Sequence, residues 1–220
     1  MDGRGVVVEF DFAAMDGAGL LFKTAKKFLK DLDKIALDDA LESRYLAGRS
    51  YSDGLARLFA VSKTKKTAQK AARDLAATFA AAVTDAAPEA VTLQFRNFVK
   101  ALTDAGLAVA IATRADIETV RSAFEPVLGE RVILYHEESE TYGFPTWESW
   151  RRACMELEMK HAFVRAVSGS GFGIKSALVA GLRSVAVVND RVAYQDFGGA
   201  GEVAEELSGK TAKKFLAALS

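Results

Sequence analysis

The feature that most constrains the fold is a regular alternation of predicted strands and helices over residues 91–188. Buried strands are expected at 107–112, 132–135, 161–167 and 184–188. Helices are expected at 91–105, 116–124, 146–157 and 172–180. Alternation of this kind is typical of βαβ units, whose right-handed crossovers produce a parallel sheet covered on both faces. The pattern therefore predicts an α/β fold with a Rossmann-like parallel sheet.

A separate strand is predicted at 6–10, and it ends in a predicted loop that contains Asp11, small residues, Gly17 and Gly19. A block of predicted helices follows this loop. Within this block the apolar side chains recur at helical spacing, with charged residues between them. Helices are expected there at 20–32, 37–47, 52–60 and 64–84. We therefore expect a core domain made of residues 1–16 and 87–220, with an inserted helical cap domain of residues 17–86.

The composition narrows the classes of function. The 29 basic and 29 acidic side chains cancel and are interspersed along the 220 residues, which argues against a nucleic-acid-binding protein. No run approaches the ~18 apolar residues of a membrane span, so no membrane association is expected. The single cysteine, Cys154, cannot form an internal disulfide, and no secretory signal pattern precedes the first strand. We expect a cytoplasmic protein, either a monomer or a homodimer.

The residues that follow the predicted strands are the candidates for function, because ligands in doubly wound sheets bind beyond the carboxyl ends of the strands. These residues are Asp11, Thr113, Glu137 or Glu138, Ser168 and Asn189. Glu9, two residues before Asp11, should share its side of the strand. The glycine-rich loop at 168–173 precedes a helix whose backbone N–H groups are able to hold an anion, and Lys175 lies just beyond it.

Four segments, in this order, resemble the motifs of the haloacid dehalogenase superfamily, in the branch with a helical cap inserted after the first strand. They are Val-Val-Val-Glu-Phe-Asp11-Phe-Ala13-Ala14-Met15, the strand ending in Thr113-Arg114, Gly143-Phe144-Pro145 at the start of a helix, and Val167-Ser168-Gly169-Ser170. The segment 46–51 resembles the substrate-facing cap loop of that family. The resemblance covers nearly the whole chain and implies the same α/β core and cap.

The resemblance also assigns roles to individual residues. In that family an aspartate after the first strand attacks phosphorus, and an acid two residues later handles the leaving-group proton. Asp11 matches the nucleophile, whereas Ala13 stands where the second acid is expected and has no proton to exchange. Thr113 matches the residue that hydrogen-bonds the phosphoryl oxygens.

Two other parts of the family's charged machinery are missing. Phe144 stands where a lysine or arginine neutralises the transferring group, a role worth several kcal/mol. Ser168 and Gly169 stand where an acidic residue holds Mg²⁺, a cation that prefers carboxylate oxygens. We therefore expect no resident metal or other cofactor, with Mg²⁺ relevant only to residual activity. Arg114, Arg49 and Tyr51 are the candidates for ligand binding.

Two hypotheses about function follow. In the first, the chain is a pseudoenzyme that has lost phosphatase chemistry and is retained to bind a small ligand or a protein partner. In the second, it is a divergent hydrolase of a phosphomonoester or a C–X bond that uses Asp11 as nucleophile. The phosphonoacetaldehyde hydrolase branch also has alanine after the nucleophile, but it uses a cap lysine where this chain has Tyr51.

Overall fold

The computed structural model describes residues 4–46, 49–137 and 145–217. Its centre is a six-stranded parallel sheet with the strand order β3-β2-β1-β4-β5-β6. The strands are β1 (Gly5–Glu9), β2 (Ala108–Thr113), β3 (Val132–His136), β4 (Val164–Ser168), β5 (Arg183–Val187) and β6 (Glu202–Ala204). The predicted α/β fold is confirmed. The sequence pattern did not predict β6, because no residue of this edge strand is buried and no apolar run marks it.

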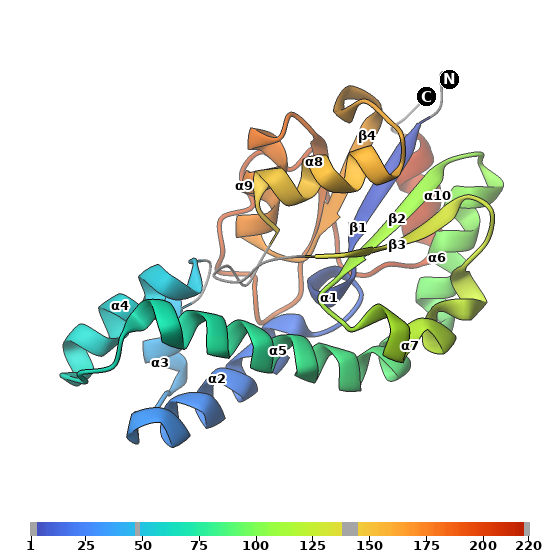
Figure 1. Cartoon of the computed structure of the whole chain (residues 1–220). Helices are drawn as coiled ribbons and strands as arrows, with labels where there is room; N and C mark the ends of the chain where they lie inside the picture. Colours follow the sequence, from blue (N-terminus) through green and yellow to red (C-terminus); the bar gives the residue numbers. More distant parts are fainter. Residues whose placement is uncertain (1–3, 47–48, 138–144, 218–220) are drawn as a thin grey trace.

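Successive side chains of β1 point to opposite faces, which is why helices cover both sides of the sheet (Figure 1). Val6 and Val8 pack in one buried cluster with Phe95. Val7 packs in a second cluster with Trp150. The first face carries α6 (Leu93–Asp104), α7 (Ile117–Phe124) and α10 (Gly209–Ala217), and the second carries α8 (Trp147–Glu156) and α9 (Gly171–Val179). Short 3₁₀ turns lie at η2 (Glu125–Val127) and η3 (His161–Phe163).

A helical unit is inserted between β1 and α6, and it forms the lower part of Figure 1. It contains α2 (Gly17–Asp33), α3 (Asp39–Leu41), the π-helical turn η1 (Glu42–Leu46), α4 (Tyr51–Ser62) and α5 (Ala68–Ala90). The helix predicted at 37–47 is thus a single helical turn followed by a π-helical turn. In addition, α5 continues past residue 86, the predicted end of the cap, and includes Pro88.

The longest of these helices, α5, is amphipathic. Leu75, Phe79 and Val83 on one face are fully buried, whereas Lys70 and Arg73 lie on the exposed face. Burial of each large apolar side chain stabilises the fold by about 1.5–3 kcal/mol, which holds α5 against its neighbours. Within the described ranges, no helix combines the length and the apolar character needed to cross a membrane.

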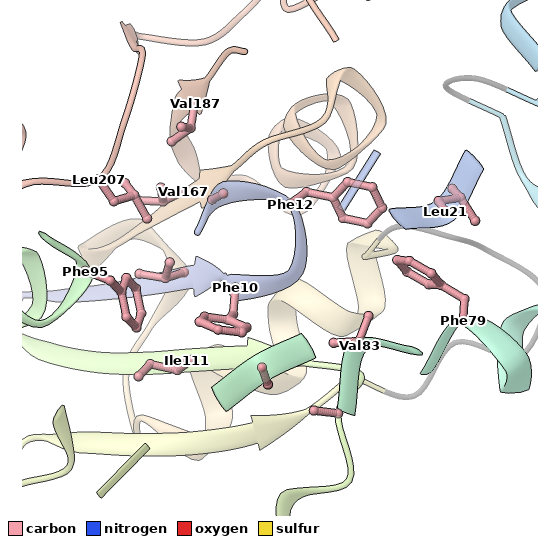
Figure 2. Close-up of a cluster of buried hydrophobic side chains, with 14 of the residues drawn as sticks. Phe10, Phe12, Leu21, Phe79, Val83, Phe95, Ile111, Val167, Val187 and Leu207 are labelled. Carbon is pink, nitrogen blue, oxygen red and sulfur yellow. The ribbon is translucent and has the colours of Figure 1, made fainter. Parts of the chain in front are cut away.

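The core and the helical unit meet at α1 (Phe10–Ala13), a helical turn where the sequence predicted a loop. The Phe10 ring lies edge-on to Phe95 and Phe124 of the core, with centroids 5.3 and 4.9 Å apart. The next aromatic ring, Phe12, points toward the helical unit and lies 5.8 Å from Phe79 (Figure 2). Asp11 is therefore held between two anchored aromatic side chains.

Candidate functional site

The carboxyl ends of four neighbouring strands, β3, β2, β1 and β4, bring the candidate residues together. Because β1 pairs in parallel with β2 on one side and β4 on the other, the ends of these strands lie side by side. Asp11 follows β1, Thr113 ends β2 and Ser168 ends β4. Glu137 follows β3 and its backbone N–H donates to the Thr113 carbonyl oxygen at 2.8 Å. All four residues are buried.

The Asp11 carboxylate is the centre of this site and has no exposed surface. Its Oδ1 accepts a hydrogen bond from the Thr113 hydroxyl at 2.6 Å. Its Oδ2 accepts two hydrogen bonds from Arg114, one from the backbone N–H at 3.0 Å and one from Nη1 at 2.9 Å. Both oxygens of the carboxylate are therefore bound by protein donors.

Arg114 forms a buried ion pair with Asp11, and only 4% of its side chain is exposed. Its guanidinium also lies 5.9 Å from the centre of the Phe12 ring. Burial acts to lower the pKa of Arg114, but four surrounding acidic groups outweigh burial and raise it. In order of effect these groups are Asp11, Glu137, Tyr51 and Glu9. The Arg114 guanidinium thus faces several buried acidic groups.

Glu9 and Glu137 are two further buried carboxyls, and each has one oxygen without a hydrogen-bond partner among the described residues. Burial raises the pKa of Glu9 to about 8, against the opposing effects of Arg114 and of the Ser168 hydroxyl that donates to Glu9 Oε2. Burial likewise raises the pKa of Glu137 to about 7, and Arg114 is again the largest opposing influence. Near neutral pH the site therefore holds protons that exposed glutamates would have released.

Two of the predicted ligand-binding residues come from the helical unit, and the structure separates them. Tyr51 is the first residue of α4, which is capped by the Ser50 side chain, and it is 2% exposed. Burial raises the pKa of Tyr51, so its phenol stays protonated and able to donate. Arg49, two residues earlier, is exposed. Tyr51 therefore joins the buried site and Arg49 does not.

The structure leaves no space for a side chain at Gly169, one of the two positions where the resemblance predicts an acid. A Cβ atom built there would lie 1.8 Å from the Phe12 carbonyl oxygen and 2.9 Å from the Ala13 nitrogen. Real Cβ atoms do not approach backbone atoms so closely, so α1 leaves no room for any side chain at this position. Ala13 is buried. Phe144, which stands where the resemblance predicts a lysine or arginine, lies outside the described residues.

The residues around Asp11 do not fit a divalent cation. A magnesium site needs carboxylate oxygens that face the ion, but a guanidinium nitrogen already occupies Asp11 Oδ2 and Gly169 offers no side chain. In the described part of the chain, no three His, Cys, Asp or Glu side chains are placed to hold a metal ion together. Arg114 supplies the positive charge next to Asp11.

The glycine-rich loop before α9 is closed by the protein itself. The Gly171 N–H donates to Gln195 Oε1 at 2.8 Å, and the Gly173 N–H donates to the Ser170 hydroxyl at 3.0 Å. Together with the Ser170 N–H, which donates to the Ser168 hydroxyl, three of the N–H groups that the sequence offered for an anion are thus already bound. Lys175, which the sequence placed just beyond this loop, forms an exposed ion pair with Asp196. Asn189 uses its side chain in a local turn, where it accepts from the Arg191 N–H.

Solved structures with the same architecture identify the fold. A phosphonoacetaldehyde hydrolase-like protein from Oleispira antarctica matches with a TM-score of 0.68 at 15% identity, over 100% of this chain and 96% of the other. CbbY from Rhodobacter sphaeroides in complex with phosphate gives 0.65 at 17% identity, over 93% and 94%. A HAD hydrolase of family IA, variant 3, from Entamoeba histolytica gives 0.65 at 16% identity, over 92% of both chains. The chain has the haloacid-dehalogenase fold. No protein-family model and no curated protein matches the sequence.

Within this haloacid-dehalogenase fold, the sequence located most of the site but not its chemistry. Asp11, Thr113, Arg114 and Tyr51 lie in one buried site, and the roles that the resemblance gives to Asp11 and Thr113 remain predictions. The ion pair between Arg114 and Asp11 was not anticipated. Its only sequence signal is a basic residue directly after Thr113 at the end of a strand.

A pH dependence of stability is expected from Glu9 within the haloacid-dehalogenase core. The folded chain keeps the Glu9 proton up to about pH 8, whereas the ordinary pKa is 4.5. The folded state thus binds more protons between these values, and the free energy of unfolding should fall as pH rises, by up to about 1.4 kcal/mol per pH unit. Glu9→Gln, which is always neutral, should flatten this slope in urea denaturation between pH 5 and pH 8.

The matched control is Glu130→Gln, which makes the same change at an exposed position of the chain. It should keep the wild-type slope. Glu137 contributes in the same direction over a narrower window, because its pKa is raised to about 7. Identical slopes for the wild type and Glu9→Gln would contradict the assignment of the proton to Glu9.

Proposed function

We propose that this haloacid-dehalogenase fold has lost phosphatase chemistry and that the site between core and cap binds a ligand without converting it. One observation carries the proposal: the Asp11 carboxylate accepts three hydrogen bonds from Thr113 and Arg114 and is fully buried. A nucleophilic carboxylate must present an oxygen lone pair to the substrate. Hydrogen bonds and an ion pair on both oxygens make Asp11 a poorer nucleophile.

Two further features support a binding role. Ala13 stands at the position of the proton-transferring acid and carries only a methyl group. The steric closure at Gly169 removes the position from which an acid would hold a metal ion. What is left at the strand ends is a set of hydrogen-bonding groups rather than a set of reacting groups.

A divergent hydrolase that uses Asp11 as nucleophile is the second candidate, and one arrangement favours it. Arg114 supplies a cation 2.9 Å from Asp11, in place of the missing family cation. Glu137, whose pKa is raised to about 7, is an acid of the kind used in general acid–base catalysis. Such an enzyme would require Arg114 to release Asp11 when a substrate enters.

Hydrolysis assays separate the two candidates. Phosphate release from a panel of phosphomonoesters and halide release from 2-haloacids would be measured with and without Mg²⁺, for the wild type, Asp11→Asn and the exposed control Asp31→Asn. We expect all three proteins to stay at the background rate. Turnover by the wild type and Asp31→Asn that is lost in Asp11→Asn would instead establish the hydrolase.

A further inference from the structure

Unpartnered polar atoms are concentrated in the buried site. Within the described ranges, seven buried side-chain nitrogen or oxygen atoms have no hydrogen-bond partner, and five of them belong to the groups around Arg114. They are Nε and Nη2 of Arg114, Oη of Tyr51, Oε1 of Glu9 and Oε1 of Glu137. Buried polar atoms are almost always hydrogen-bonded, so this concentration of free donors and acceptors points to a bound ligand or ordered water.

The free atoms of Arg114 define the shape of that occupant. Nη1 is bound to Asp11, whereas Nε and Nη2 are free and form one edge of the planar guanidinium. Two parallel N–H groups on one edge match two oxygens bonded to the same atom, as in a carboxylate or a phosphate. The arginine is 4% exposed, so this edge is directed into the protein.

The groups around Arg114 donate hydrogen bonds to an anion when they are protonated, and in that state they do not repel it. The Tyr51 hydroxyl is a donor without a partner. Glu9 and Glu137 would repel an anion when ionised, but their raised pKa values of about 8 and about 7 leave them neutral at mildly acidic pH. A neutral carboxyl donates one hydrogen bond. Among the described residues, the other charges that act on these groups are those of Asp11 and Arg114, which cancel, and that of Arg152, which acts on Glu137.

We propose that the Nε–Nη2 edge of Arg114 and the Tyr51 hydroxyl bind a compact oxyanion, a carboxylate or phosphate group, in the site between core and cap. The inference rests on the proposed function and names its ligand class. Glu9 and Glu137 complete the site in their protonated forms, so binding of the oxyanion is linked to the uptake of protons. Tyr51 belongs to α4, so the ligand contacts the helical unit as well as the core.

Titration calorimetry with inorganic phosphate and with oxalate tests the proposal. Bis-Tris and Tris chloride buffers are used at pH 6 and pH 9, because neither buffer is an oxyanion. Oxalate carries the same charge at pH 6 and at pH 9. A change in its affinity between these two pH values therefore reports on protonation of the protein. We expect oxalate, phosphate or both to bind at pH 6 and to bind at least tenfold more weakly at pH 9. Binding of one probe and not the other identifies the ligand as a carboxylate or a phosphate.

Three variants test the assigned groups. Tyr51→Phe keeps the buried ring and removes only the free hydroxyl, and it should weaken binding about tenfold. Arg114→Lys removes the planar edge and should abolish binding, while Glu137→Gln, a permanently neutral side chain, should retain more binding than the wild type at pH 9. The matched controls Tyr194→Phe and Arg49→Lys change exposed residues and should bind as the wild type does.

Absence of binding by both probes at pH 6 would overturn the proposal and leave ordered water as the occupant. The proposal would also be overturned if both Tyr51→Phe and Arg114→Lys bind the probes as tightly as the wild type does. For Arg114→Lys this comparison requires that the variant is folded. Inorganic phosphate and oxalate have no bond that a hydrolase of this fold would cleave here, so the titration is independent of the hydrolysis assays. Turnover in those assays would reject the proposed function without deciding whether Arg114 holds an oxyanion.

Discussion

Arg114→Ala is expected to lower the free energy of unfolding by about 3–5 kcal/mol, because removal of one partner leaves the other charge of a buried ion pair uncompensated. Arg114 lies 2.9 Å from Asp11, and it is the largest of the influences that lower the pKa of Glu9 and of Glu137 against the effect of burial. Its loss would leave three carboxyls in one buried site with no positive charge beside Asp11. Urea denaturation at neutral pH measures the effect.

The control is Arg49→Ala, which makes the same truncation at an exposed position and should change stability by less than about 0.5 kcal/mol. The double variant Asp11→Asn with Arg114→Met removes both charges. It should be more stable than Arg114→Ala, because no buried charge is left without a partner. A loss for Arg114→Ala that is as small as that for Arg49→Ala would show that the ion pair does not stabilise the fold.

Gly169→Asp, which restores the acid of the family pattern, is expected to destabilise the fold by about 3 kcal/mol or more and to give no magnesium-dependent hydrolysis. Any Cβ at this position meets the Phe12 carbonyl oxygen at 1.8 Å, so the backbone of α1 must move. Overpacking that displaces backbone costs typically 1–3 kcal/mol and occasionally more. Thermal or urea unfolding, followed by a phosphomonoester assay with Mg²⁺, measures both outcomes.

Gly169→Ala adds a Cβ atom without a charge and so separates the steric effect from the effect of the charge. It should lower the free energy of unfolding by most of the amount expected for Gly169→Asp. Gly129→Ala is the control, because a Cβ at Gly129 meets no atom within 4 Å. It should leave the free energy of unfolding nearly unchanged. A stable Gly169→Asp protein that hydrolyses a phosphomonoester with Mg²⁺ would contradict both the steric argument and the loss of the metal site.

Local sequence patterns predict which residues lie at the strand ends, but they do not predict which of these side chains contact one another. Runs such as 107–112 predict strands, and the topology of parallel sheets then places Thr113 near Asp11 without any knowledge of side-chain contacts. The sequence pattern does not predict the direction in which a side chain points. Arg114 was predicted to bind a ligand, and the structure uses Nη1 of the same side chain on Asp11.

The burial of Glu9 and Glu137 was likewise not predictable from the pattern. Glutamates are mostly exposed in proteins. Glu9 ends β1 and Glu137 follows β3, at the carboxyl ends of the strands where ligands bind in such sheets. Their burial depends on the packing of other elements around the strand ends, including the first turn of α4, which carries Tyr51. Their raised pKa values follow from that packing and not from the neighbouring sequence.

The sequence by itself determined the α/β alternation, the helical insertion after the first strand, and the positions of Asp11 and Thr113 at strand ends, because periodicity and strand order act locally. Only the tertiary structure decided that Arg114 pairs with Asp11, that Gly169 has no space for a side chain, and that Tyr51 rather than Arg49 reaches the site. These contacts join residues far apart in the chain, with Asp11 and Arg114 separated by 103 positions. Such contacts are set by side-chain direction and close packing, which no local pattern encodes.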